Sequence, residues 1–308
     1  ISDRKTKSPS MAFSKDGTVL TLLDEDGMWR AWRVENGEPL QTGMVGNQVN
    51  HAVSFDTENS RWLLAGNAGL IWLDTEPSWV LSHQLGNGGP DSPIRDRVNA
   101  LAFSPDGKWL ASGGGEPSRN GEIILWNAKD GILLHDLNRI HSDTVLGLEF
   151  SPDGWLLASA SSDKFAKIMD CQTWEVLKSL EGHTHHVMDV SWKTDGRLIA
   201  TSGADKMIKT WDYPHGNRKK NVEGFDKEVT TVRFAGTTDQ FITSSGDASL
   251  RLMDSQGKEI KRFGKIDDFQ QSAAISSDGN LIASGGEDGV LRIYEAEKTE
   301  ASIIFSSP

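Results

Sequence analysis

Phe150-Ser-Pro-Asp-Gly154 is the stretch that decides the fold, because it recurs along the chain. Phe103-Ser-Pro-Asp-Gly107 is a close copy, and Phe13-Ser-Lys-Asp-Gly17 and Trp192-Lys-Thr-Asp-Gly196 are looser ones. Weaker copies begin at positions 55, 234 and 275, so successive copies are separated by 42, 48, 47, 42, 42 and 41 residues. Such regular spacing predicts seven repeats of one structural unit.

The residues around each copy predict four antiparallel strands. In the fourth copy, an alternating segment (145–150) precedes the Asp-Gly turn, and an apolar run (155–160) follows it. A third run (166–170) and a more polar fourth run (175–180) complete the unit. Alternation with a period of two, broken by Gly, Asp and Ser, is typical of strands joined by hairpins. Because one such sheet cannot bury both faces alone, we predict an all-β, seven-bladed β-propeller with four antiparallel strands per blade.

The repeat spacing also predicts the organisation of the chain. We expect an N-terminal arm of residues 1–9, which is too polar for a strong strand, followed by one propeller of residues 10–308. Ala301-Ser-Ile-Ile-Phe305 supplies a fourth strand to the last blade, so the ring should close by packing of blade 7 on blade 1. The predicted blades are approximately 10–45, 46–88, 94–139, 140–181, 182–223, 224–264 and 265–308.

Composition narrows the classes of partner. The 308 residues carry a net charge of −12, which disfavours nucleic acid, because a phosphate backbone attracts clustered Lys and Arg. No apolar run approaches the roughly 18 residues of a membrane span, so no membrane insertion is predicted. The single cysteine, Cys171, excludes an intrachain disulfide and a multi-thiolate zinc site. Because the chain starts at Ile1 without a signal peptide, we expect a processed chain or a piece of a longer one.

The repeats resemble the WD-repeat β-propeller family. The best match is the fifth copy, with Gly182-His183 at its start and Trp211-Asp212 closing its third strand. The resemblance extends over residues 10 to 306 and indicates fold far more strongly than function. In that family a His, a Ser or Thr, an Asp and a Trp form a buried, hydrogen-bonded tetrad within a blade. The resemblance assigns these structural roles to His183, Thr201, Asp205 and Trp211.

The other copies depart from this set. The fourth copy keeps a His, a Ser and an Asp but has Met169 at the Trp position, and the third keeps Trp126 but has Ile94 at the His position. Buried polar groups need partners, and a linked network locks turns to inner strands. We therefore expect most blades to depend on apolar packing and blade 5 to be the most rigid.

Two insertions around the third blade point to a binding surface. Residues 86–97 join blade 2 to blade 3, and residues 114–121 extend the turn between strands two and three of blade 3. Both should project from the face of the propeller usually called the top, and long loops on a rigid scaffold often carry binding residues. Loop drift between degenerate repeats explains the insertions equally well. The predicted rim carries Arg95, Arg97, Arg119 and Asn120.

Repeat phase places further binding candidates on the top face. An exposed Phe beside charged residues is typical of an interface hot spot. For both Phe candidates, however, we favour packing between blades. The candidates are Lys164, Phe165, His185, His186, Lys206 and Phe269.

No catalytic residue, metal site or cofactor is predicted. The chain lacks a phosphate-binding motif and a Gly-x-Ser-x-Gly elbow. His183, His185 and His186 cluster, but His183 is assigned to the tetrad, which leaves the other two as surface loop residues. The basic run Arg218-Lys-Lys220 falls in the outermost strand of blade 5, where charges prevent edge-to-edge aggregation.

These observations favour a non-catalytic protein–protein interaction scaffold, which docks a partner protein or another domain of the same polypeptide on the top face. An alternative rests on residues 113–122, which resemble a blade loop of bacterial proteins that join a WD-repeat propeller to a c-type cytochrome domain. That resemblance implies a propeller module that positions or shields a haem domain, in the bacterial periplasm rather than the cytoplasm. A third hypothesis, a propeller enzyme with a metal in its channel, predicts metal binding that depends on His185 and His186.

Overall fold

Short antiparallel strands make up most of the structure. The computed structural model describes residues 10–14, 16–23, 28–44, 50–56, 61–66, 69–74, 81–86, 89, 91–264 and 266–306. These residues form strands β1 to β28, and none of them belongs to a helix long and apolar enough to cross a membrane. The expected N-terminal arm, residues 1–9, lies outside the described residues.

The strands pair into seven four-stranded antiparallel sheets, which we number as blades 1 to 7 in chain order. Blade 1 contains β1 (Ser10–Phe13), β2 (Val19–Leu23), β3 (Met28–Arg33) and β4 (Pro39–Met44). Blade 2 contains β5 (Asn50–Asp56), β6 (Arg61–Gly66), β7 (Gly69–Asp74) and β8 (Leu81–Leu85). Blade 3 contains β9 (Arg97–Phe103), β10 (Trp109–Gly115), β11 (Glu122–Asn127) and β12 (Leu133–Asp136). Blade 4 contains β13 (Val145–Phe150), β14 (Leu156–Ser161), β15 (Phe165–Asp170) and β16 (Val176–Glu181).

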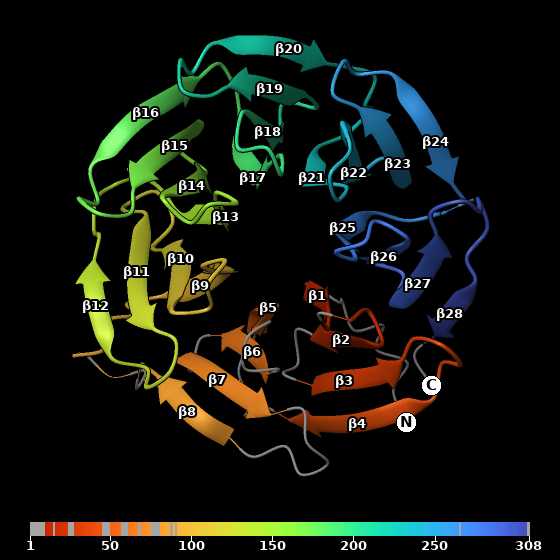
Figure 1. Cartoon of the computed structure of the whole chain (residues 1–308), viewed down its shortest axis with the longest axis horizontal. Coiled ribbons are helices and arrows are strands. Elements are labelled where there is room, and N and C mark those ends of the chain that lie inside the picture. The colour runs from red at the N-terminus through yellow and green to blue at the C-terminus, as the bar shows by residue number, and fades with distance from the viewer. Residues whose placement is uncertain are drawn as a thin grey trace.

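The remaining blades follow the same order. Blade 5 contains β17 (Val187–Trp192), β18 (Leu198–Gly203), β19 (Ile208–Asp212) and β20 (Arg218–Val222). Blade 6 contains β21 (Val229–Phe234), β22 (Gln240–Ser245), β23 (Ser249–Asp254) and β24 (Glu259–Phe263). Blade 7 contains β25 (Gln270–Ile275), β26 (Leu281–Gly286), β27 (Val290–Glu295) and β28 (Ile303–Ser306). In Figure 1 the sheets stand around a common axis, with the first strand of each at the centre and the fourth outside. The predicted all-β propeller is therefore confirmed.

The repeated Ser-Pro-Asp-Gly stretch forms the tight turn between the first and second strands. In blade 4 the hydroxyl of Ser151 donates to Asp153 Oδ1 at 2.6 Å and accepts the Leu156 N–H at 2.9 Å. The Asp153 carboxylate also accepts the Trp155 N–H at 3.1 Å, and Gly154 has a φ of 76°, which favours glycine. The residues of this hairpin turn therefore satisfy one another's hydrogen bonds, which explains why the same sequence recurs in several repeats.

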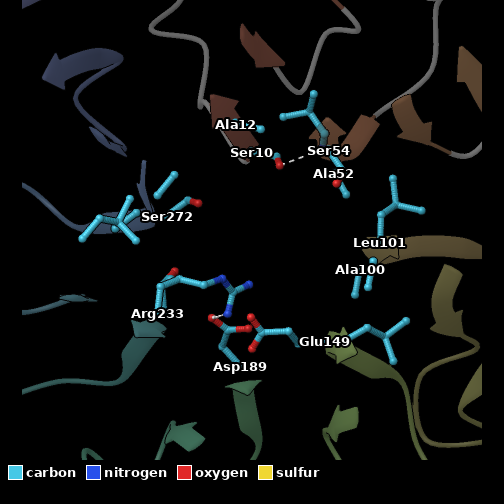
Figure 2. Close-up of a pocket in the computed structure, with 18 of the residues that line it drawn as sticks. Ser10, Ala12, Ala52, Ser54, Ala100, Leu101, Glu149, Asp189, Arg233 and Ser272 are labelled. Atoms are coloured by element: carbon cyan, nitrogen blue, oxygen red, sulfur yellow. Dashed lines mark hydrogen bonds and ion pairs between the residues drawn. The ribbon is translucent and has the colours of Figure 1, made fainter. Parts of the chain in front are cut away.

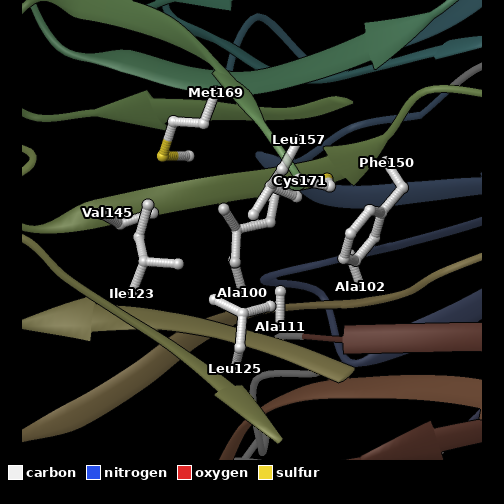
Figure 3. Packing of buried hydrophobic residues seen from close by; sticks show 11 residues of the cluster. Ala100, Ala102, Ala111, Ile123, Leu125, Val145, Phe150, Leu157, Met169 and Cys171 are labelled. Carbon is white, nitrogen blue, oxygen red and sulfur yellow. The ribbon is translucent and has the colours of Figure 1, made fainter. Parts of the chain in front are cut away.

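Apolar side chains fill the space between neighbouring blades. Between blades 3 and 4, for example, Ala111, Ile123 and Leu125 pack against Leu157 and Met169 (Figure 3). Full burial of one such aliphatic side chain contributes about 1.5–3 kcal/mol. A row of small clusters between blades thus replaces a single central core.

Blade 7 packs directly on blade 1, as the sequence predicts. Among the described residues, the sheet of blade 7 consists of β25 to β28 alone. Leu291 and Ile293 of β27 join one buried cluster with Leu20 and Leu22 of β2. The rings of Trp32 and Phe305 lie 4.8 Å apart across the same junction. The ring therefore closes by side-chain packing.

Candidate functional site

Blade 5 contains a buried, hydrogen-bonded chain of four side chains at the top face, the end that carries the loops between blades and the turns between second and third strands. His183 lies 2.9 Å from Asp205 through Nδ1 and 2.8 Å from the Thr201 hydroxyl through Nε2. The Trp211 indole donates to the same hydroxyl at 2.9 Å. The four residues that the resemblance assigned to a tetrad are thus brought together, and they tie the loop before β17 to β18 and β19.

Burial sets the protonation of this network. Burial lowers the pKa of His183, which keeps the imidazole neutral. Burial acts to raise the pKa of Asp205, but the hydrogen bonds from His183 and the Thr184 N–H, together with the charge of Lys209 at 3.6 Å, outweigh it, so the pKa lies below its usual value. The carboxylate also accepts the Thr184 N–H at 3.1 Å. The arrangement satisfies its own polar groups and has a structural role.

Other blades keep parts of this network. In blade 4, His141 contacts Asp163 at 2.8 Å and Ser159 at 2.7 Å, while Met169 is buried in the apolar cluster. In blade 3, the Trp126 indole donates to the Ser112 hydroxyl at 2.9 Å. These contacts follow the pattern read from the repeats.

Blade 6 replaces the histidine with an arrangement that the sequence analysis missed. Arg251 of β23 donates to Asp247 at 2.7 Å and to the Gly224 carbonyl at 2.8 Å, and its guanidinium lies 4.4 Å from the centroid of the Phe225 ring. In blade 7, Arg292 pairs with Asp288 at 2.6 Å. In both blades the Arg follows the turn Asp by four residues, a signal that the sequence contains.

The lengthened turn of blade 3 is fixed against blade 4. The Ser118 N–H donates to Asp143 Oδ1 at 2.7 Å, and the Gly121 N–H donates to the His141 carbonyl at 2.9 Å. Within the turn, Asn120 Oδ1 accepts the Glu116 N–H at 2.9 Å. The lengthened turn of blade 3 is therefore held in place by hydrogen bonds from its backbone to the segment that leads into blade 4.

The rim residues differ in their contacts. Arg119 is exposed and pairs with Glu116, and Arg97 is exposed and pairs with Asp96 at 3.6 Å. Arg95 is also exposed, and its backbone N–H donates to Glu122 Oε2 at 3.4 Å. Burial raises the pKa of the Glu122 carboxyl to about 7.

The next blades continue this surface. Lys164 and Lys206 occupy matching turns of blades 4 and 5, are exposed, and form no ion pair within the described residues. The rings of His185 and His186 lie 4.3 Å apart. Burial lowers the pKa of His186, and so do the neighbouring His185 and Lys164.

The two Phe candidates do not extend the exposed surface. Phe165 is half-buried. Phe269 is also half-buried and lies so close to Gly246 that a β-carbon there would be 2.4 Å from its ring. Phe269 precedes β25, across the ring from β9 (Figure 1), so the structure does not bring it together with the blade 3 rim.

The central channel contains a charged cluster that the sequence analysis did not identify (Figure 2). The inner strands enclose about 730 Å³. Arg233 of β21 pairs with Asp189 of β17 and donates to the Val190 and Val232 carbonyls at 3.1 and 2.9 Å. On the adjacent strand β13, Glu149 accepts the Trp192 N–H at 2.6 Å.

The cluster links the inner strands of blades 4, 5 and 6. Burial raises the pKa of Glu149 to about 7, and burial raises the pKa of Asp189 against the opposing charge of Arg233. Neither His185 nor His186 lines this channel. Within the ranges that the structure describes, no three His, Cys, Asp or Glu side chains are grouped as metal ligands would be.

Comparison with known proteins agrees with the repeat architecture. The family model for the WD domain, G-beta repeat, matches residues 90–127, 133–170, 174–212 and 263–295. The chain is 27% identical over 209 residues to the eukaryotic translation initiation factor 3 subunit I of Candida glabrata, covering 66% of this chain and 50% of that protein. It is 34% identical over 158 residues to the chromatin assembly factor 1 subunit FAS2 homolog of Oryza sativa, covering 40% and 30%. It is 29% identical over 164 residues to the WD repeat-containing protein WDS homolog of Arabidopsis thaliana, covering 52% and 30%.

Each of these matches covers only part of the chain. Four segments of the chain are similar to the WD repeat, and the chain spans half or less of the length of these relatives. All three are eukaryotic proteins, and none is named as a cytochrome.

Proposed function

We propose that the chain is a non-catalytic scaffold that docks a partner protein, or another domain of its own polypeptide, on the top face of the propeller. WD repeats support this role, and two of the relatives are named as subunits of larger factors. The buried polar networks of blades 4 and 5 satisfy their own groups, which accounts for their histidines without chemistry.

The observation that carries the proposal is a row of four exposed cationic side chains on an acidic molecule, two of which, Lys164 and Lys206, form no ion pair within the described residues. The chain has a net charge of −12, yet Arg97, Arg119, Lys164 and Lys206 follow one another across the top of blades 3 to 5. We call these four residues the top arc. A local positive region on a negative protein steers and orients an acidic partner surface. The ordered blade 3 turn would hold part of the arc in place without an ordering cost on binding.

A pull-down with charge-matched variants tests the proposal. One variant carries Arg95→Ala, Arg97→Ala and Arg119→Ala, and the control carries Arg218→Ala, Lys219→Ala and Lys220→Ala on the exposed strand β20. Both lose three positive charges. A partner that the wild type and the control retain and the rim variant loses, as identified by mass spectrometry, supports docking on the top face. If all three proteins retain the same partners, the rim is not the docking site.

The redox alternative has its own readout in the same experiment. A haem absorption band in the recovered partner would favour a propeller module of a cytochrome assembly, with a periplasmic location. The comparisons give this alternative no support, and the scaffold is the function that we put forward.

A further inference from the structure

A groove walled by tryptophans lies on the face opposite the top arc, between blades 3 and 4. It encloses about 410 Å³. Trp109 begins β10, Trp155 directly precedes β14, and Trp174 lies in the turn between β15 and β16. His135 of the outer strand β12 adds a fourth ring. We call these four residues the Trp groove.

The rings of the Trp groove are tilted and leave aromatic surface open. Trp109 and Trp174 have ring centroids 5.7 Å apart at 59°, and His135 and Trp174 lie 5.3 Å apart at 42°. Trp155 is 64% exposed, the largest exposed apolar side chain in the described residues. An aromatic face carries negative electrostatic potential and attracts cations.

The backbone of Trp174 is unusual for a bulky residue. Its φ is 60°, and its N–H donates to the Asp170 carbonyl at 2.8 Å. The matching turns of three other blades have glycine at this position, with φ between 70° and 76°: Gly37, Gly131 and Gly216. A β-carbon disfavours this backbone conformation, so Trp174 raises the free energy of the turn relative to glycine. The indole gains its contacts with Trp109 and His135 in return.

Two carboxylates, those of Asp153 and Asp170, lie close in sequence to residues of the Trp groove and carry negative charge there. Asp170 accepts the Gln172 and Thr173 N–H groups at 2.7 and 2.8 Å, and Asp153 lies in the turn that leads to Trp155. Neither carboxylate forms an ion pair in the part of the chain that the structure describes. Cys171 lines the groove directly after Asp170, and burial, together with the charges of Asp170 and Asp153, raises the pKa of its thiol to about 12.

We propose that the Trp groove binds a lysine or arginine side chain from an extended segment of a partner protein. The indole faces would contact the apolar stem and the cationic head, and the two carboxylates would supply the charge complement. An uncharged apolar segment would gain only the first of these contacts. This site is independent of the proposed top-face docking, because it lies at the other end of the strands.

Short peptides test the proposal on the intact chain. The probes are Ac-Gly-Gly-Lys-Gly-Gly-NH₂, its arginine equivalent, and a norleucine equivalent that keeps the stem and removes the charge. Binding is followed by NMR shifts of the indole N–H signals. The cationic peptides should bind about tenfold more tightly than the norleucine peptide, the loss expected when about 1.4 kcal/mol of cation–π and charge interaction disappears.

Matched variants separate the groove from the fold. Trp174→Gly should abolish the indole shifts while retaining the native circular dichroism spectrum, because glycine occupies the matching turns. Asp153→Asn should weaken binding, whereas Asp278→Asn should not, because it changes the same turn in blade 7. Equal binding of norleucine and lysine, unchanged binding by a folded Trp174→Gly, or no shift with any peptide would overturn the proposal.

Discussion

In blade 5 the turn between the second and third strands is held by a histidine network beside a lysine, Lys209, that lies 3.6 Å from Asp205, whereas in blade 6 the same turn is held by a closer arginine pair without a histidine. His183 and Thr201 satisfy Asp205 and Trp211 in blade 5. In blade 6, Arg251 pairs directly with Asp247 and stacks on Phe225, a residue of the loop that leads into the blade.

The comparison shows that each of these blades needs partners for its turn Asp, but that different side chains can provide them. In both blades the turn Asp accepts a backbone N–H from the entering loop, from Thr184 at 3.1 Å in blade 5 and from Asp226 at 3.2 Å in blade 6. What varies is the set of groups around the buried carboxylate, which is His183 with Lys209 at 3.6 Å in blade 5 and Arg251 at 2.7 Å in blade 6. The two solutions should therefore differ in their dependence on mutation and on pH.

The largest effect should come from breaking the blade 6 pair. Arg251→Met keeps the apolar stem but leaves Asp247 buried without its cation, which should lower the free energy of unfolding by about 3 kcal/mol at pH 7. Urea unfolding measures this change. A loss below about 0.5 kcal/mol, the range of an exposed pair, would contradict a buried role for Arg251.

The next effect should come from breaking the blade 5 network. His183→Leu removes one buried hydrogen bond from the Thr201 hydroxyl and one from Asp205, and should cost about 2 kcal/mol. His215→Leu is the matched control, because His215 contacts Asp212 at 2.9 Å but is exposed. The control should change the unfolding free energy by less than about 0.5 kcal/mol. Equal losses in the two variants would remove the distinction between buried and exposed pairs.

A pH change should weaken blade 5 before blade 6. Because the pKa of His183 is lowered, its contribution to stability is complete above the unfolded value of about 6.5 and decreases below it. Burial acts to raise the pKa of Asp247, but its hydrogen bonds and Arg251 lower it, so its contribution decreases only below about pH 4.

Amide hydrogen exchange can separate the two turns. The Ala204 N–H of blade 5 and the Gly246 N–H of blade 6 make matching bonds of 2.9 Å to the entering loops. Between pH 7 and pH 5 the protection factor of Ala204 should fall, while that of Gly246 should stay constant. A parallel fall at both amides would show that the histidine does not control the blade 5 turn.

The smallest effect should come from completing the network of blade 4. Met169→Trp supplies the missing indole to the Ser159 hydroxyl, but Met169 is fully buried. A new hydrogen bond of about 1 kcal/mol would oppose overpacking of about 1–3 kcal/mol, so the net loss should be near 1 kcal/mol. Urea unfolding measures the net change in stability, and the indole N–H signal of the new Trp in NMR spectra reports whether its hydrogen bond forms. A gain in stability would show that the blade has room for the Trp.

The repeat period made the propeller and the closing junction predictable, because both depend on strands at fixed positions in each repeat, and the family resemblance assigned the blade 5 tetrad. The channel cluster was not predictable in this way. Arg233 and Asp189 are 44 residues apart in different repeats, and nothing in the alternation of their strands indicates that they meet. The Trp174 turn was missed for a local reason, since the sequence shows a Trp where the left-handed backbone would predict glycine.

The most direct test of the scaffold account is hydrogen exchange on the complex with the partner recovered by the pull-down. The account predicts added protection in residues 114–121 and 182–186, around the top arc, with none in the outer strand β20. Protection confined to β20, or absent from the top face, would contradict docking on this face of the propeller.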